Sequence, residues 1–196
     1  MFTRRDLFHI LPARAAACLG CTGAALCGAQ ITSQTPPAGF GEKADMTWQQ
    51  VFDFSYKGYA GVMKKLAAQI GHEEFLEMLQ RASSEAAAER LTALLPPAAP
   101  RDLGTFEQGM KGNSMYRYAL VYDIVEESAS AFEIRVSQCL WAKTWRAQHA
   151  ADIGYAVICH PDFAASAAFN AKLRMTRTKT LMQGHDCCNH RWVLEI

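Results

Sequence analysis

The sequence lacks an excess of charge of either sign. Its 196 residues include 20 Lys and Arg against 19 Asp and Glu, which gives a formal net charge of +1. A protein that binds nucleic acid usually carries a clear basic excess, so no nucleic-acid partner is expected. Half of the residues are hydrophobic and a fifth are charged. This composition excludes a disordered chain and is typical of one globular domain.

The N-terminus lacks an uninterrupted hydrophobic run, because Arg14 breaks its first apolar stretch and makes it a poor transmembrane span. The hexapeptide Thr3-Arg4-Arg5-Asp6-Leu7-Phe8 resembles the twin-arginine export motif, which a receptor reads. We therefore expect residues 1–29 to be a twin-arginine-type signal and residues 30–46 to be a linker. The predicted partner is the twin-arginine export machinery, and the predicted location is the periplasm. An uncleaved signal that anchors the protein in the membrane and lipidation at Cys21 stay open as alternatives.

Paired C-x-x-C knuckles are absent from the part of the sequence that follows the predicted signal. Four of the seven cysteines lie there, namely Cys139, Cys159, Cys187 and Cys188. Their spacing is not that of a structural zinc site. No cofactor is predicted on this pattern, and zinc or another divalent metal is kept as an alternative.

The first half of this part has a helical period. Apolar residues recur at three- and four-residue steps from Trp48 to Ile70, with Thr47 as the predicted N-cap. After Gly71 the same spacing continues until the proline-rich segment 95–100 ends it. Residues 102–111 predict one more short helix.

The second half changes to a period of two, which predicts strands at 116–124 and 132–136 in one hairpin. Alternation at 173–182 and 188–196 predicts a second hairpin. Helices are expected between the hairpins: one over 139–150, a short one capped by Asp152 and stopped by His160-Pro161, and an alanine-rich one capped by Asp162.

These elements predict an α+β fold, in which N-terminal helices precede an antiparallel sheet of two hairpins with a helical insert between them. The predicted domain covers 47–196, with a helical part at 47–112 and a sheet part at 113–196.

Two short clusters contain residues that could carry chemistry. The first is Cys159-His160-Pro161-Asp162, where a helix start would lower the pKa of a nearby thiol. In the second, a strand from Cys188 would place Cys188, His190 and Trp192 on one face and Cys187, Asn189 and Arg191 on the other. The combined candidates for nucleophile, base and orienting carboxylate are Cys188, Asp186, Cys159, His160, Asp162 and His190.

Four ordered blocks stand out between Tyr116 and the C-terminus. They read Gln138-Cys139-Leu140-Trp141-Ala142-Lys143-Thr144, Asp152-Ile153-Gly154-Tyr155, Cys159-His160-Pro161-Asp162-Phe163, and Thr178-Lys179-Thr180-Leu181-Met182-Gln183-Gly184 followed by Asp186, Cys188 and Arg191. In this order they resemble the L-2-amino-thiazoline-4-carboxylic acid hydrolase family. The resemblance implies a hydrolase that opens the ring of a cyclic isothiourea to give N-carbamoyl-L-cysteine.

The implied reaction gives each candidate residue a role. The ring carbon between nitrogen and sulfur is electrophilic once the amidine is protonated, and Asp162 or Asp186 would hold that amidinium. Cys188 as a thiolate, or water activated by His160, would attack the carbon, and the ring sulfur would leave with help from a general acid. The candidates for holding the substrate carboxylate are Arg177, Lys179 and Arg191.

Two other interpretations remain open. The same sheet could form a non-catalytic module in the periplasm that binds a small molecule or a metal. Alternatively, Cys159 and Cys188 could form a structural disulfide after export.

Overall fold

The computed structural model describes residues 46–195 and begins with two long helices, α2 (Trp48–Ile70) and α3 (His72–Leu94). Thr47 caps α2 as predicted: its hydroxyl accepts from Gln50 N, and the Gln50 side chain accepts from Thr47 N. Such a capping box satisfies two amide groups that have no partner inside the helix. Gly71 separates the two helices with a φ of 110°, a backbone conformation that glycine adopts without a Cβ penalty.

Two shorter helices follow, α4 (Leu103–Gly112) and α5 (Ser114–Ala119). Helix α4 confirms the short helix predicted over 102–111, and the Asp102 side chain caps it by accepting from Thr105 N at 2.8 Å. Helix α5 corrects the predicted strand at 116–124, because the strand begins only at Leu120. The Asn113 side chain accepts from Met115 N at 3.0 Å, and this N-cap starts a helical turn where the alternating tyrosines had suggested a strand.

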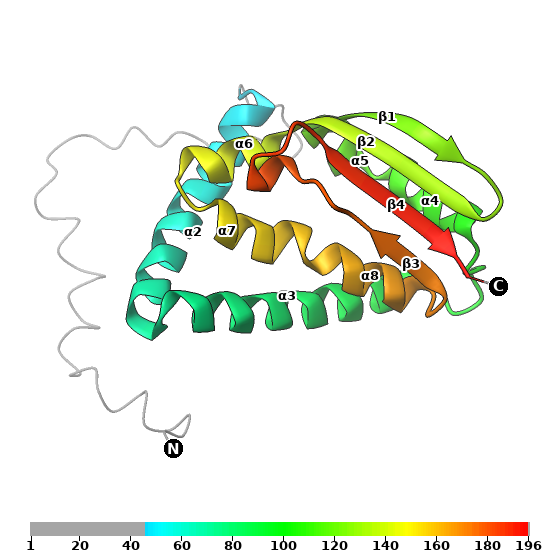
Figure 1. Cartoon of the computed structure of the whole chain (residues 1–196), viewed down its shortest axis with the longest axis horizontal. Helices are drawn as coiled ribbons and strands as arrows, with labels where there is room; N and C mark the ends of the chain where they lie inside the picture. The colour runs from blue at the N-terminus through cyan, green and yellow to red at the C-terminus, as the bar shows by residue number, and fades with distance from the viewer. Residues whose placement is uncertain (1–45, 196) are drawn as a thin grey trace, which may run out of the picture. The chain divides into compact units, whose positions relative to one another are not determined.

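The fold class is α+β, as predicted. Four strands, β1 (Leu120–Glu127), β2 (Ala131–Cys139), β3 (Leu173–Thr176) and β4 (Cys188–Leu194), form one sheet in the order β1-β2-β4-β3, and all neighbours are antiparallel (Figure 1). The helical insert connects β2 to β3.

One face of the sheet carries the core. In register, Phe132 pairs with Trp192, Ile134 with His190, and Val136 with Cys188. Helices α4 and α8 (Pro161–Phe169) cover this face. The sheet cluster consists of the buried residues Leu103, Phe132, Ile134, Val136, Phe169, Leu173, Cys188 and Trp192.

A second apolar cluster, the helical cluster, lies among α2, α3 and the insert. Its buried members are Ala60, Ala67, Phe75, Ala142, Trp145, Ala150, Ile153 and Met182. Cys139 and Leu181 pack against both clusters, so the two clusters meet at these two side chains.

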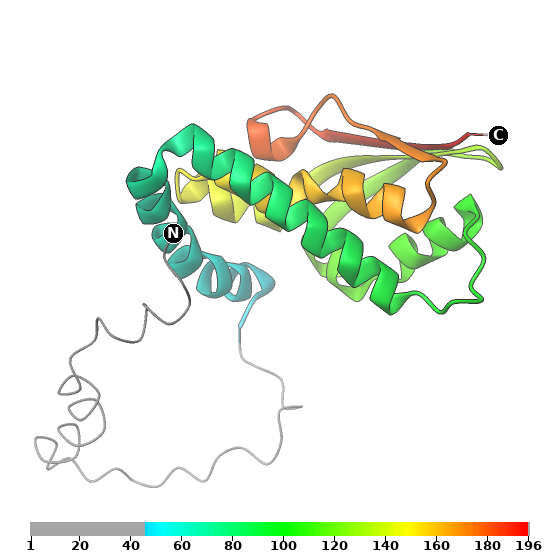
Figure 2. The same ribbon diagram turned by 90° about the horizontal axis from the view of Figure 1, so that it is seen from below.

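The insert consists of α6 (Leu140–Ala147), α7 (Ala151–Gly154), a π-helical turn (Tyr155–Cys159) and α8. The prediction that His160-Pro161 ends a helix is wrong. His160 N donates to Tyr155 O at 2.8 Å, and Pro161 begins α8 directly afterwards. Pro161 is tolerated there because the first turn of a helix does not need its amide hydrogen. Asp162 therefore lies inside α8 and is not its cap. Figure 2 shows α8 lying alongside α3.

The predicted long strand at 173–182 is also shorter than expected. Strand β3 ends at Thr176, and a 3-10 turn, η3, covers Leu181–Gln183. Between them, Thr178 N and Lys179 N donate to the Asn189 side chain at 3.0 and 2.7 Å instead of to a neighbouring strand.

None of the helices in residues 46–195 combines the length and the apolar composition needed to cross a membrane. The predicted signal and nearly all of the predicted linker lie outside the described residues.

Candidate active site

A buried guanidinium forms the centre of the candidate site. The Arg177 side chain is 1% exposed, and its Nη1 donates to Asp162 Oδ2 at 2.7 Å and to His190 Nε2 at 3.0 Å. Its Nη2 donates to Cys159 O at 2.7 Å. The rings of Tyr155 and Phe163 lie 5.7 and 5.1 Å from its central carbon, which stabilises the cation. Most of the hydrogen-bonding capacity of Arg177 is therefore used inside the protein.

The π-helical turn makes these contacts possible. Phe163 N donates to His160 O rather than to the carbonyl of Cys159, so Cys159 O is free to accept from Arg177. Pro161 has no amide hydrogen for the carbonyl of Ala156, and the Ser83 hydroxyl on α3 donates to that oxygen at 2.7 Å instead. A π turn of this kind is often found at a functional site.

The contact with Arg177 fixes the tautomer of His190. A guanidinium can only donate, so Nε2 accepts and the ring proton lies on Nδ1. Nδ1 is buried and has no hydrogen-bond partner among the described residues. Burial, and then the Arg177 charge, lower the pKa of His190 to about 3. His190 is therefore neutral at any physiological pH.

Asp162 is the carboxylate of this centre. Its side chain is 36% exposed, yet burial raises the pKa of the carboxyl, while Arg177 opposes the shift. Enough protein therefore surrounds this carboxyl to desolvate it, although part of the side chain remains accessible. Burial, and then the Asp162 charge, raise the pKa of Tyr116, which places this phenol on α5 in the field of Asp162.

Three thiols surround the same centre. Burial is the largest cause of a raised pKa at all three. It raises the pKa of Cys139 to about 11, and it also raises the pKa of Cys159 and of Cys188. The Asp162 charge makes a smaller contribution to all three shifts, and Cys188 contributes to those of Cys139 and Cys159, so these groups lie near one another. All three side chains are protonated thiols at neutral pH, because a raised pKa disfavours the thiolate.

The prediction that a helix start lowers the pKa of the Cys159 thiol is wrong, because Cys159 lies within a continuing helical segment and not at the start of one. The cysteine at a helix start is Cys139, whose sulfur accepts from Ala142 N at 3.4 Å as the N-cap of α6. This contact opposes the burial of Cys139 but does not overcome it. The sulfur of Cys188 accepts from Leu181 N at 3.2 Å.

His160 lies on the side of this centre that faces α3. Its Nδ1 and the Ser84 hydroxyl are 3.1 Å apart, and its ring is flanked by Tyr155 and Phe163. Burial, and then the Arg177 charge, lower the pKa of His160. His160 is therefore available as a neutral base.

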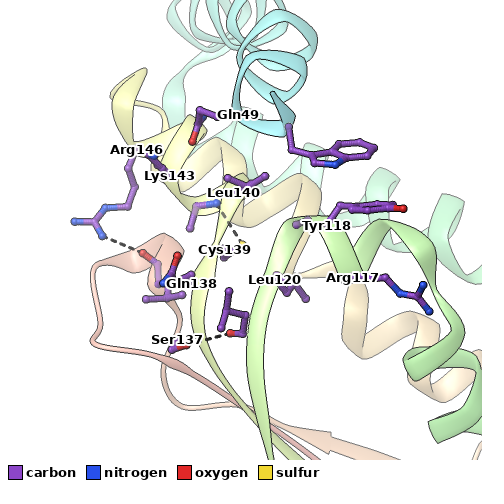
Figure 3. Close-up of a pocket in the computed structure, with 15 residues that line it drawn as sticks. Gln49, Arg117, Tyr118, Leu120, Ser137, Gln138, Cys139, Leu140, Lys143 and Arg146 are labelled. Atoms are coloured by element: carbon purple, nitrogen blue, oxygen red, sulfur yellow. Dashed lines mark hydrogen bonds between the residues drawn. The ribbon is translucent and has the colours of Figure 1, made fainter. Parts of the chain in front are cut away.

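A pocket of about 740 Å³ opens beside Cys139, between the start of α2, the start of β1 and helix α6 (Figure 3). Cys139 and Leu181 line this pocket, and the Leu181 amide bonds to Cys188. Cys139 is thus part of the pocket wall, and Cys188 lies behind it, in contact with the lining residue Leu181. Gln138, Leu140 and Lys143 also line the pocket.

Three predicted site residues lie elsewhere. Asp186 and Lys179 form an exposed ion pair at 3.1 Å. Arg191 pairs with Glu126 and Glu133 on the outer face of the sheet, at 2.9 and 3.4 Å. The structure thus brings together Cys159, His160, Asp162, Arg177 and Cys188, and separates Asp186, Lys179 and Arg191 from them.

The sequence interpretation missed Cys139 and Tyr116 as site residues. Cys139 was not among the predicted site residues, although its place between a strand and a helix was a usable signal. Tyr116 had been placed in a strand. No metal-binding group of three or more His, Cys, Asp or Glu occurs in residues 46–195, and the four cysteines there are free thiols.

The fold and the site define an α+β protein with a buried arginine–carboxylate centre, three thiols near it, and an open pocket lined by one of these thiols, Cys139. The family model of L-2-amino-thiazoline-4-carboxylic acid hydrolase matches residues 53–192. The chain belongs to this family.

Two solved structures are similar at low identity. The phenol-responsive sensory domain of the transcription activator PoxR, with phenol, is 11% identical with a TM-score of 0.44, covering 70% of this chain and 73% of that one. A trafficking protein particle complex subunit 3 from Naegleria fowleri, covalently bound to palmitic acid, is 10% identical with a TM-score of 0.47, covering 74% of this chain and 96% of that one. No curated protein matches the chain significantly.

Proposed function

We propose that the protein hydrolyses a cyclic isothiourea that carries a carboxylate, such as L-2-amino-thiazoline-4-carboxylic acid, to N-carbamoyl-L-cysteine. Water adds to the ring carbon between nitrogen and sulfur, and the bond from that carbon to sulfur breaks. The carbon becomes a urea carbonyl, and the sulfur takes a proton and becomes the product thiol. Membership of the hydrolase family supports this reaction.

The observation that carries the proposal is the Arg177–Asp162 pair with its thiols, located where two apolar clusters meet. A buried pair is costly to desolvate and adds little net stability, so a role in chemistry accounts for it better than a role in folding. A carboxylate whose pKa is raised toward the working pH is also a more effective base than an exposed one.

Asp162 has the central role in this proposal. As a carboxylate it takes the proton of the attacking water, while Arg177 holds it in position and stays charged. The protonated thiols near it can supply the proton that the leaving sulfur requires. This assignment replaces a resting Cys188 thiolate as nucleophile, because burial raises the pKa of that thiol.

A non-catalytic module that binds a small molecule is the second candidate. The protonated state of all three thiols favours it, since no activated nucleophile is present at rest. Turnover distinguishes the two candidates.

Asp162 and Asp186 both lie close to a cysteine in the sequence, but only Asp162 belongs to the buried centre, so their substitution should have different effects. We expect Asp162→Asn to lower kcat for the thiazoline acid by about 10²–10⁴-fold, the usual contribution of a general base. Asp186→Asn should leave kcat within about twofold, because Asp186 is exposed and pairs only with surface cations. Release of the product thiol measures the rate, and mass spectrometry identifies N-carbamoyl-L-cysteine.

Circular dichroism and thermal unfolding control for folding of Asp162→Asn, in which the amide oxygen can still accept from Arg177. Asp162→Glu, which keeps the carboxylate, should recover part of the rate. Equal rates for Asp162→Asn and the unmodified protein would contradict the assignment, and no thiol release by the unmodified protein would favour the binding module.

A further inference from the structure

The pocket beside Cys139 has an uneven distribution of charge. Arg117, Lys143 and Arg146 line it, and no Asp or Glu is found among its described lining residues. None of these three cations forms an ion pair within residues 46–195. Arg146 donates from Nη1 to Leu181 O at 3.2 Å, which leaves its Nη2 for another acceptor. Such a surface attracts an anion.

The side of the pocket that faces Lys143 and Arg146 carries two aromatic rings. Trp48 and Tyr118 stack with ring centroids 4.3 Å apart at an angle of 15°, and both residues remain more than 40% exposed. Figure 3 shows Tyr118 across the pocket from Lys143 and Arg146. An exposed pair of rings gives a flat apolar group a surface on which to stack.

A hydrogen-bond acceptor with no partner lies between these two sides. The Gln49 amide nitrogen donates to Asp53 Oδ1 at 2.8 Å and to Thr144 Oγ1 at 3.1 Å, and Thr144 itself donates to Asp53. These bonds fix which end of the amide is oxygen. Gln49 Oε1 is buried and has no hydrogen-bond partner in the described part of the chain. A buried acceptor without a partner costs about 1–3 kcal/mol, so an N–H from a ligand would satisfy it.

We infer that this pocket binds an organic carboxylate that also carries an N–H donor and an aromatic group. The carboxylate lies beside Lys143 and Arg146, the N–H faces Gln49 Oε1, and the aromatic group contacts Trp48 and Tyr118. The inference rests on the proposed function for the reaction. It narrows the substrate class to cyclic isothioureas that carry an aromatic group, which the thiazoline acid itself lacks, in addition to the carboxylate. The volume of about 740 Å³ also falls in the range of about 300–1,000 Å³ that is typical for drug-sized ligands.

Calorimetric titration with N-acetyl-phenylalanine tests the three contacts without turnover. We expect this probe to bind about tenfold or more tightly than N-acetyl-phenylalaninamide, which lacks the acid, and than N-acetyl-alanine, which lacks the ring. N-acetyl-N-methylphenylalanine, which lacks the N–H, should bind more weakly by a similar factor.

Variants locate the binding. Lys143→Gln with Arg146→Gln should abolish the preference for the acid over the amide, and Trp48→Ala should abolish the preference for phenylalanine over alanine. Arg174→Gln is the matched control, because Arg174 is an exposed cation on β3 that pairs with Glu195 at 3.1 Å and should leave every preference unchanged.

Equal binding of acid and amide, or an unchanged preference in the double variant, would overturn the inference. The proposed function fails separately: if the thiazoline acid is not hydrolysed but the pocket variants still lose these preferences, the binding site stands without the reaction. If hydrolysis occurs and the variants bind every probe as the unmodified protein does, the inference fails and the reaction stands.

Discussion

Burial sets the protonation of the residues around Arg177. It keeps Cys139, Cys159 and Cys188 as thiols and His190 as a neutral ring, and it raises the pKa of Asp162. The Arg177 charge has the opposite effect on Asp162, since a nearby cation favours the carboxylate. A site with one fixed cation, one basic carboxylate and several proton donors is suited to moving protons at neutral pH.

His190 gives a prediction about acid stability. Its pKa is about 3 in the folded protein and about 6.5 when unfolded, so the unfolded state binds more protons between these values. The stability that neutral His190 provides is complete above about pH 6.5 and is lost as the pH falls toward 3, at up to about 1.4 kcal/mol per pH unit.

The variant His190→Gln should remove this loss, because its amide oxygen can still accept from Arg177 but does not titrate. Urea unfolding at several pH values from 4 to 7 measures the free energy of unfolding of both proteins. His149→Asn, at an exposed position, should keep the original pH dependence. Parallel curves for His190→Gln and the unmodified protein would show that the ring titrates normally.

At the scale of elements, α7, the π turn and α8 form one continuous helical segment whose position depends on close packing at Gly154. A Cβ atom there would lie 2.6 Å from Trp145 Cγ and 2.9 Å from Met182 Sδ. Both of these neighbours are almost fully buried, so neither can move away easily. The glycine thus permits the close approach of the helical segment to α6 and η3.

We expect Gly154→Ala to lower the free energy of unfolding by about 1–3 kcal/mol, the usual cost of overpacking. The matched control is Gly58→Ala in α2, where a Cβ would meet nothing within 4 Å. That substitution should instead raise stability by up to about 1 kcal/mol, because alanine is the better helix former. Chemical denaturation measures both changes, and a neutral Gly154→Ala would mean that Trp145 and Met182 can adjust.

Elements with a regular period could be predicted from the sequence, and those that depend on one side chain could not. The long apolar repeats gave α2 and α3, and alternation correctly placed Cys188, His190 and Trp192 on one face of β4. Asn113 started a helix inside an alternating segment, and Asn189 took the amide groups that a longer β3 would have used. Such contacts are tertiary or very local, and a period does not report them.

The candidate site was predictable to the same limited extent. Adjacency in the sequence grouped Cys159, His160 and Asp162 correctly, because they share one helical segment. It failed for Asp186, because the chain turns between η3 and β4 and exposes that carboxylate. Arg177 lies one residue beyond β3, so the strand period could not reveal that its side chain is buried.

At the scale of the whole molecule, Arg177 connects the two apolar clusters. It donates to Cys159 O, at the edge of the helical cluster, and to His190 on β4 beside the sheet cluster. A charge in this position is stable only with its partners, because an unpaired buried ion is strongly destabilising. The pair Arg177–Asp162 therefore ties the site to the stability of the fold.

We expect Arg177→Leu to lower the free energy of unfolding by about 2–4 kcal/mol, somewhat below the cost of breaking a fully buried pair, because Asp162 retains some exposure. Arg191→Leu, which breaks only surface ion pairs, should cost at most about 1 kcal/mol. The double variant Arg177→Leu with Asp162→Leu should recover part of the loss while remaining inactive, because it removes both charges together. Urea unfolding and the thiol-release assay measure these outcomes. If the double variant is no more stable than Arg177→Leu, the loss comes from packing and not from an unpaired carboxylate, and the ion pair does not link the two clusters as described.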